Sequence, residues 1–210
     1  MKYLSTILFV VSLAPGAVMA QPPGAAGPAP APPATASTST WRVDSSHSSA
    51  GFSVRHMMVS TVRGSLGPIS GTVEYDGKTV TSVKADITID VTKINTGNER
   101  RDNDLRNADF FDVARYPTII FKSKRVQPGG EGRFGLVGDL TMHGVTREVT
   151  LEVEGPSPTV KDQRGGLKIG ATATTKLNRR EFGLNYNNLI EAGPVVADEV
   201  TVTIDIELNK

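Results

Sequence analysis

The sequence predicts an all-β domain built from eight or nine antiparallel strands. Apolar and polar residues alternate with a period of two in eight separate runs between residues 51 and 208, as expected for strands with one buried face. Most of these runs are joined by short turns, which favours antiparallel neighbours. Only one segment of the domain has helical character. At 210 residues and 38% hydrophobic content, the chain is long enough to form one such domain with its own core.

The first twenty residues have the pattern of a secretory signal peptide. Lys2 provides a positive start, residues 4–13 form an apolar run too short to span a bilayer, and Ala20 ends a small-residue cleavage pattern. We therefore expect cleavage after Ala20 and a periplasmic location. The chain contains no cysteine, which excludes a lipid-anchored cysteine and a disulfide framework. A secreted domain of this kind must be held together by its own packing.

Residues 21–40 form a Pro/Ala-rich segment without charge and without large apolar side chains. Such a composition cannot bury enough surface to order itself, so the sequence predicts a disordered linker. This linker serves either as a spacer or as a leader without function. The folded domain is then expected to occupy residues 41–210.

The charge of the chain excludes some classes of partner. Without Lys2, 22 basic residues balance 22 acidic residues. Nucleic-acid binding needs a clustered excess of Lys and Arg, and so does a polybasic membrane patch. Neither nucleic acid nor stable membrane insertion is therefore predicted. A homodimer stays open as an alternative, because the sequence shows no recognisable dimer interface.

The eight apolar faces follow one another along the chain. In the clearest run, residues 83–91, Lys84 and Asp86 lie opposite the apolar side chains. The segment between the first two runs, residues 56–69, is interpreted either as a continuation of the strand or as a long turn. The apolar residues of these runs are, in order, Phe52, Val54 and His56; Ile69, Gly71, Val73 and Tyr75; Val83, Ala85, Ile87, Ile89 and Val91; Ile119, Ile120 and Phe121, in a less regular run over residues 117–126; Phe134, Leu136, Leu140 and Met142; Val145, Val149, Leu151 and Val153; Ile169, Ala171, Ala173 and Leu177; and Val200, Val202, Ile204, Ile206 and Leu208.

Two of these runs form a predicted hairpin over residues 138–154. Only His143 and Gly144 stand between them, and glycine tolerates the positive φ that a tight turn requires. His143 is therefore interpreted as a turn residue that bonds the backbone.

A single short helix is predicted over residues 98–108. This segment lacks β-branched residues, is rich in charge and follows the turn signal of residues 95–97. It can present Leu105 and the following Phe110 and Phe111 to an end of the sheet. Its Arg and Asp residues are interpreted as a solvated, self-paired face.

Strands with one apolar and one polar face can form either a two-sheet sandwich or a closed up-and-down barrel. The interior of a barrel of about eight strands is either filled by side chains or able to hold one small ligand. Small residues on otherwise apolar faces would leave free volume inside, or would merely fit the taper of a packed core. They are Gly71, Ala85, Gly138, Ala171 and Ala173.

The search for catalytic motifs finds no nucleophile elbow, no phosphate-binding loop, no HExxH and no cysteine nucleophile. The spacing of His47, His56 and His143 does not indicate a metal site, and none is predicted. His56 shares a face with apolar residues, which is typical either of a satisfied core histidine or of a ligand contact. Arg179, after the run ending at Leu177, could reach an anionic head group, or it could be a surface charge paired with Glu181 or Glu191.

Five segments of the sequence together resemble the YceI family of secreted, lipocalin-like isoprenoid-binding proteins. They are FSVRHMMVSTVRGSL, RDNDLRNADFFDVARYPTIIFKS, GDLTMHGVTREVTLEVE, LNRREFGLNYN and DEVTVTIDIEL, and the likeness extends over residues 41–210. The family often has a His where this chain has Asp104. The family pattern falls on Phe52, His56, Phe110, Phe111, Pro117, Phe121, His143, Gly144, Arg179, Phe182 and Gly183.

The resemblance implies an eight-stranded antiparallel, up-and-down, lipocalin-like β-barrel with one short helix across an end. It also implies that the barrel holds a long apolar chain, such as a polyisoprenoid or quinone precursor, without catalysis and without a cofactor. The candidate ligand-binding residues are Phe52, Val54, His56, Ile87, Ile89, Phe121, Leu136, Leu140, Met142, Ala171, Ala173, Arg179 and Ile204.

Three functions follow from these observations. The first is a periplasmic carrier for a long linear lipid, which needs only an apolar tunnel. The second is an enzyme that acts on a lipid-like substrate through His56 or His143 with a nearby acid. The third is an interaction domain with a solid core and no ligand. The volume of the barrel interior separates the first from the third.

Overall fold

The computed structural model describes residues 38–187, 189–190 and 193–210. The predicted signal peptide and nearly all of the predicted linker therefore lie outside the described residues. Strand β1 begins at Ser39, two residues before the predicted start of the domain.

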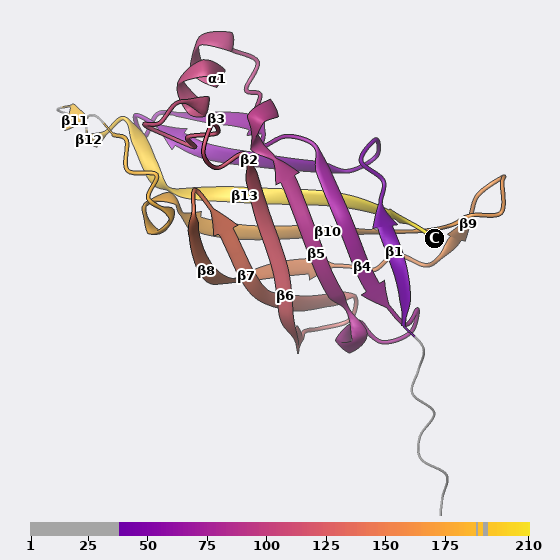
Figure 1. The fold of residues 1–210 in the computed structure, drawn as a ribbon. Helices are drawn as coiled ribbons and strands as arrows, with labels where there is room; N and C mark the ends of the chain where they lie inside the picture. Colours follow the sequence, from indigo (N-terminus) through magenta and orange to yellow (C-terminus); the bar gives the residue numbers. More distant parts are fainter. Residues whose placement is uncertain (1–37, 188, 191–192) are drawn as a thin grey trace, which may run out of the picture. The chain divides into compact units, whose positions relative to one another are not determined.

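The described part of the chain is almost entirely β-structure (Figure 1). The main sheet contains β1 (Ser39–Val43), β2 (Ser49–His56), β3 (Ser60–Ser65), β4 (Ile69–Tyr75), β5 (Lys84–Asp90), β6 (Thr118–Pro128), β7 (Arg133–Met142), β8 (Val145–Glu154), β9 (Val160–Lys161), β10 (Leu167–Asn178) and β13 (Val196–Asn209). A separate two-stranded ribbon pairs β11 (Leu189–Ile190) with β12 (Gly193–Pro194). The helical elements are η1 (Val80–Ser82), η2 (Val91–Lys93), α1 (Glu99–Arg106) and η3 (Arg179–Phe182).

The sheet closes on itself into the predicted barrel. Eight strands follow one another in the order β13-β1-β4-β5-β6-β7-β8-β10, and β10 pairs with β13 to complete the circle. Every neighbouring pair is antiparallel. The barrel is thus an up-and-down meander, and the sandwich alternative is wrong.

Three strands of the main sheet were not predicted: β1, β3 and the two-residue β9. β1 contributes Trp41 to the core, but its neighbours Ser39 and Thr40 continue the polar composition of the preceding segment. β3 has the sequence STVRGS, in which Val62 is the only large apolar residue, so no alternation of apolar and polar residues can be detected. Pairing explains these strands: β1 holds the end of β13, while β2 pairs with the rest of the same β13 edge and carries β3. The short β9 pairs with the beginning of β10.

The predicted hairpin is present as β7 and β8. Met142 pairs with Val145, so the loop consists of His143 and Gly144 alone. Both have positive φ, 51° and 74°, as a type I′ turn requires. The prediction that His143 is a turn residue is confirmed.

Helix α1 is also confirmed, but only some of its charged residues form the predicted solvated face. The Asn98 side chain caps the helix by accepting from the Arg101 amide at 3.0 Å. Asp102 is buried and accepts from the amide and hydroxyl of Thr96, while Arg106 donates to backbone carbonyls after β5. Asp102 and Arg106 therefore fasten α1 to the chain before it, while Glu99, Arg100 and Asp104 are exposed as predicted. No helix among the described residues is both long and apolar enough to cross a bilayer.

Candidate binding cavity

The barrel interior contains an elongated cavity of about 210 Å³. Alternate residues of β13, from Val200 to Leu208, all line it, so it follows this strand for roughly 26 Å at the usual rise per residue. The wall is formed almost entirely by aliphatic and aromatic side chains. A space so long and of such small volume is narrow, which suits a linear chain better than a compact ligand. The solid-core alternative is wrong.

Twelve of the thirteen candidate ligand-binding residues lie in the cavity wall. The period of two placed all of them except Arg179 on inward faces, and closure of the barrel brings these faces together. His56 is the exception, because it lies outside the cavity in the vestibule described below. The residues in the wall are Phe52, Val54, Ile87, Ile89, Phe121, Leu136, Leu140, Met142, Ala171, Ala173, Arg179 and Ile204.

The small residues of the apolar faces divide into two groups. Ala85, Ala171 and Ala173 line the cavity, where short side chains leave free volume. Gly71 and Gly138 do not. A Cβ on Gly71 would lie 2.1 Å from the Asp86 carbonyl oxygen, and one on Gly138 would lie 2.4 Å from that of Lys122. These two glycines therefore allow close approach of neighbouring strands, and Gly138 also leaves room for the ring of Phe121.

Several cavity residues were missed as ligand contacts. Leu105, Phe110 and Phe111 come from α1 and the loop after it, and they form part of the wall at that end of the barrel. Leu184 enters from the loop after η3. No periodicity identifies such loop residues. Tyr75 could have been found, because it lies on a predicted apolar face; burial raises the pKa of its phenol, which stays neutral.

Arg179 lies in the cavity wall, but its polar end is fully occupied. It is 5% exposed, and burial lowers the pKa of its guanidinium. Its N–H groups donate to the backbone carbonyls of residues 184, 186, 196 and 197 and to the Asp198 carboxylate. A guanidinium has five N–H donors, so these contacts use them all. The predicted surface pairing with Glu181 is wrong, and the contacts argue against head-group binding; Glu191 lies outside the described residues.

A wider, more polar space lies outside the α1 end of the cavity. We call this space of about 860 Å³ the outer vestibule. Its wall includes the charged or titratable side chains of His56, Arg100, Arg101, Asp104 and Asp109. Five apolar residues line both spaces and mark the mouth where they meet: Phe52, Val54, Leu105, Phe110 and Val196.

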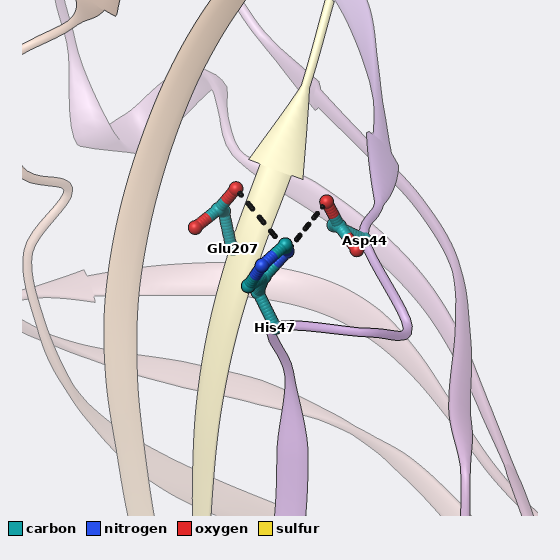
Figure 2. Close-up of side chains that lie close together, drawn as sticks. All are labelled: Asp44, His47 and Glu207. Atoms are coloured by element: carbon teal, nitrogen blue, oxygen red, sulfur yellow. Dashed lines mark hydrogen bonds and ion pairs between the residues drawn. The ribbon is translucent and has the colours of Figure 1, made fainter.

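The remaining histidines serve structural contacts. His143 Nδ1 lies 3.2 Å from the Phe182 carbonyl oxygen, and its ring packs edge-on against Tyr116. His47 Nδ1 lies 3.0 Å from Asp44 and 4.0 Å from Glu207 (Figure 2). Asp44, His47 and Glu207 are close enough together to offer ligands to a metal ion.

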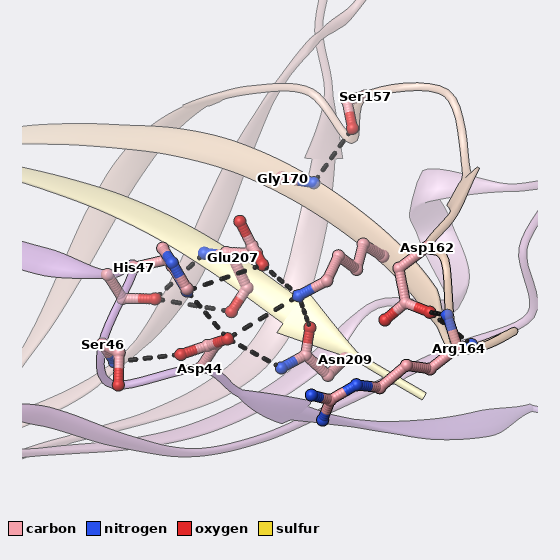
Figure 3. Close-up of polar contacts among 12 residues, drawn as sticks. Asp44, Ser46, His47, Ser157, Asp162, Arg164, Gly170, Glu207 and Asn209 are labelled. Atoms are coloured by element: carbon pink, nitrogen blue, oxygen red, sulfur yellow. Dashed lines mark hydrogen bonds and ion pairs between the residues drawn. The ribbon is translucent and has the colours of Figure 1, made fainter.

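Lys168 supplies a positive charge to the carboxylates of Asp44 and Glu207. Its ammonium lies 2.5 Å from Glu207 and 3.7 Å from Asp44, and it also donates to Asn209. Figure 3 shows the Asp44, His47, Glu207 and Asn209 side chains of this cluster. The hydrogen bond from Lys168 to Glu207 raises the pKa of the lysine, and hydrogen bonds from Asn209 and His47 lower that of Asp44. A cation is therefore already in place. The cluster ties the β1–β2 turn to β13 and β10.

A closed antiparallel barrel of eight strands, hollow along its axis and covered by a helix at one end, defines the class of lipocalin-like binding folds. Within this class the chain belongs to the YceI family, because the family model described as "YceI-like domain" matches residues 41–208. A UPF0312 protein of Staphylococcus aureus strain N315 is 37% identical over 153 residues, which cover 73% of this chain and 86% of that protein.

Solved structures show the same fold. The Campylobacter jejuni YceI protein is 28% identical, with a TM-score of 0.64 over 74% of this chain and 89% of that one. Burkholderia cenocepacia BcnA is 22% identical, with a TM-score of 0.68 over 79% and 98%. A polyisoprenoid-binding domain from Saccharophagus degradans is 18% identical, with a TM-score of 0.58 over 80% and 97%.

Proposed function

We propose that this protein binds a long, linear, apolar lipid of the isoprenoid class in the barrel cavity and carries it in the periplasm. The observation that carries the proposal is the shape and chemistry of the cavity, which is long, narrow and apolar. The description of the Saccharophagus domain as polyisoprenoid-binding supports this ligand class. The signal-peptide pattern of the first twenty residues supports the location.

The physics of the cavity is sufficient for binding without catalysis. Each buried methylene contributes about 0.8 kcal/mol, so about ten of them give on the order of 8 kcal/mol before the costs of association. The polar groups of Thr175 and Arg179 in the wall are already bonded to the protein, Thr175 to the Thr150 carbonyl at 2.9 Å. We therefore propose a binding protein and assign no reaction to the cavity.

Substitution inside the cavity tests the proposal. Ala173→Trp would place a large ring inside the narrow cavity, and we expect it to abolish uptake of a polyprenol. Thr174→Trp is the matched control, because the neighbouring position faces outward on the same strand. Native mass spectrometry of gently purified protein measures bound lipid directly. Absence of any lipid in the wild-type protein, together with no polyprenol uptake, would contradict the proposal.

A further inference from the structure

The tip of the β2–β3 hairpin exposes an unusual group of apolar side chains. Met57, Met58 and Val59, which we call the hairpin tip, are 38%, 52% and 78% exposed. They are three of the five exposed large hydrophobic residues in the described part of the chain. Exposed apolar residues that gather in one place mark an interaction surface far more often than scattered ones do.

The hairpin tip is held in a fixed conformation. Met57 and Met58 both have positive φ, 50° and 58°, which long side chains rarely adopt. Arg55 crosses the loop and donates to the Met58 carbonyl at 2.6 Å and to the Thr61 hydroxyl at 3.1 Å. The Met57 amide donates to the Val195 carbonyl at 2.8 Å. The chain thus keeps an unfavourable backbone in order to present these side chains outward.

The hairpin tip lies beside the mouth of the cavity. His56 and Ser60, the residues on either side of it, both line the outer vestibule, as does Val62. Figure 1 shows β2 and β3 next to α1, at the end of the barrel away from β9. A surface that seats the tip would therefore also face the mouth.

The charges of the hairpin favour an anionic lipid surface. Residues 45–73 contain Arg55 and Arg63 but no Asp or Glu. Both arginines are exposed, and they lie on the strands that carry the apolar tip. Apolar side chains at the end of an element with cationic residues behind them match a bilayer interface, where the tip enters the acyl boundary and the cations meet phosphates.

We propose that the hairpin tip docks the cavity mouth onto a lipid bilayer, so that the bound chain passes between bilayer and cavity without crossing water. This inference rests on the proposed function, since it explains how such a ligand is loaded. The contact is peripheral, made by one hairpin, and it needs no membrane-spanning segment. It assigns to Met57, Met58 and Val59 a role that the cavity itself does not require.

Tryptophan fluorescence tests the docking step separately from lipid uptake. The chain has one tryptophan, Trp41, which is 3% exposed and gives a constant background. In Val59→Trp, we expect the emission to shift to the blue when vesicles of phosphatidylcholine mixed with phosphatidylglycerol are added, and brominated lipids to quench it. No shift with these vesicles would overturn the proposal, whether or not the cavity binds lipid.

Substitution of the two methionines tests the transfer step. Met57→Asn/Met58→Asn removes the apolar side chains while asparagine tolerates the positive φ. Binding to the same vesicles should fall by about tenfold or more, because each buried methionine contributes more than that factor to transfer from water. Transfer of a fluorescent polyprenol from vesicles should slow by a similar factor, while its uptake from detergent stays at the wild-type rate. Val160→Ser, which removes an exposed apolar side chain on β9, is the matched control.

The outcomes separate the two proposals. If the wild-type protein takes up no polyprenol from either source, the proposed function fails, and vesicle binding still decides the docking proposal. If the asparagine variant also loses uptake from detergent, the tip acts on the cavity and docking is overturned. Unchanged transfer from vesicles in this variant likewise overturns docking, and it would direct the search for the partner of the tip to proteins.

Discussion

Two hairpin turns at the same end of the barrel share an unusual backbone conformation but use different residue types in it. Both the β7–β8 turn and the β2–β3 loop place two consecutive residues at positive φ. The β7–β8 turn uses His143 and Gly144, residue types that suit this conformation, and packs them against Tyr116 and η3. The β2–β3 loop uses two methionines and leaves them exposed. The first turn follows the local rules of folding, and the second departs from them.

The difference shows which side of the mouth is structural. Around the β7–β8 turn, the Phe182 carbonyl contacts His143, the Glu181 carbonyl accepts from Arg147, and Arg179 fastens the loop after η3 to β13. Each of these groups has a partner within the protein. The hairpin tip has its backbone fixed, whereas its side chains are 38% to 78% exposed. Departures from local preference that bring no packing in return are expected at functional sites.

The largest effect should come from breaking the packed side at Arg179. Arg179→Met keeps the aliphatic stem but removes the guanidinium donors to the carbonyls of residues 184, 186 and 197, while the Val196 carbonyl keeps Asn187 as a donor. We expect the free energy of unfolding to fall by about 3–5 kcal/mol, as for other buried charged groups whose partner is removed. Urea denaturation followed by circular dichroism measures it.

Arg180 provides the control for this prediction. It lies on the same 3-10 helix and donates to the same Asp198 carboxylate at 2.7 Å, but it is exposed. Arg180→Met should therefore cost less than about 1 kcal/mol. Equal losses in the two variants would show that burial of Arg179 is not what holds this side of the mouth together.

A smaller loss is expected at the turn itself. In Gly144→Ala, the new Cβ would lie 2.6 Å from the Tyr116 ring, at a φ of 74°. Backbone strain and overpacking together should lower the free energy of unfolding by about 2–4 kcal/mol. Gly77→Ala isolates the backbone contribution, because Gly77 has a φ of 80° and a Cβ added there would meet nothing within 4 Å. If both alanine variants lose the same amount, Tyr116 yields freely and the turn is not packed as described.

The barrel could be predicted where alternation was strong. Each predicted strand exists, because inward residues such as Ile87 and Ile204 recur at the period that a buried face imposes. The strands of the main sheet that were missed, β1, β3 and β9, are short and carry almost no alternation. β1 and β3 are fixed by pairing with distant strands or with a neighbour that is itself held by one, and β9 is fixed by pairing with β10. Pairing between residues far apart in sequence leaves no trace in a local pattern.

The cavity wall could be predicted for the same reason, but its mouth could not. Most residues of the cavity wall lie on the apolar faces of strands, which alternation predicts, whereas Leu105 and Leu184 reach the wall from a helix and a loop. Arg179 was correctly placed at the end of a strand, yet its partners come from residues 184–198, which only the folded chain brings around it. The whole-chain charge balance also concealed the local excess at Arg55 and Arg63, because the acidic residues lie on other elements.

The smallest expected change in the free energy of unfolding is an increase, and it concerns the hairpin tip. Met57→Asn/Met58→Asn relieves the positive-φ strain of the hairpin tip and removes only side chains that are 38% and 52% exposed. We expect the free energy of unfolding to rise by roughly 1 kcal/mol. The midpoint of urea denaturation should move upward accordingly, in the same variant that loses vesicle binding.

Alanine at the same two positions separates strain from apolar contact. Met57→Ala/Met58→Ala removes the side chains but keeps a residue type that disfavours positive φ, so stability should stay within about 0.5 kcal/mol of wild type while vesicle binding is lost. A protein that could be stabilised at its hairpin tip by asparagine but carries methionine there uses these side chains for something other than folding. If the asparagine variant is instead less stable than wild type, the methionines pack in the folded state, and the tip is structural like the β7–β8 turn.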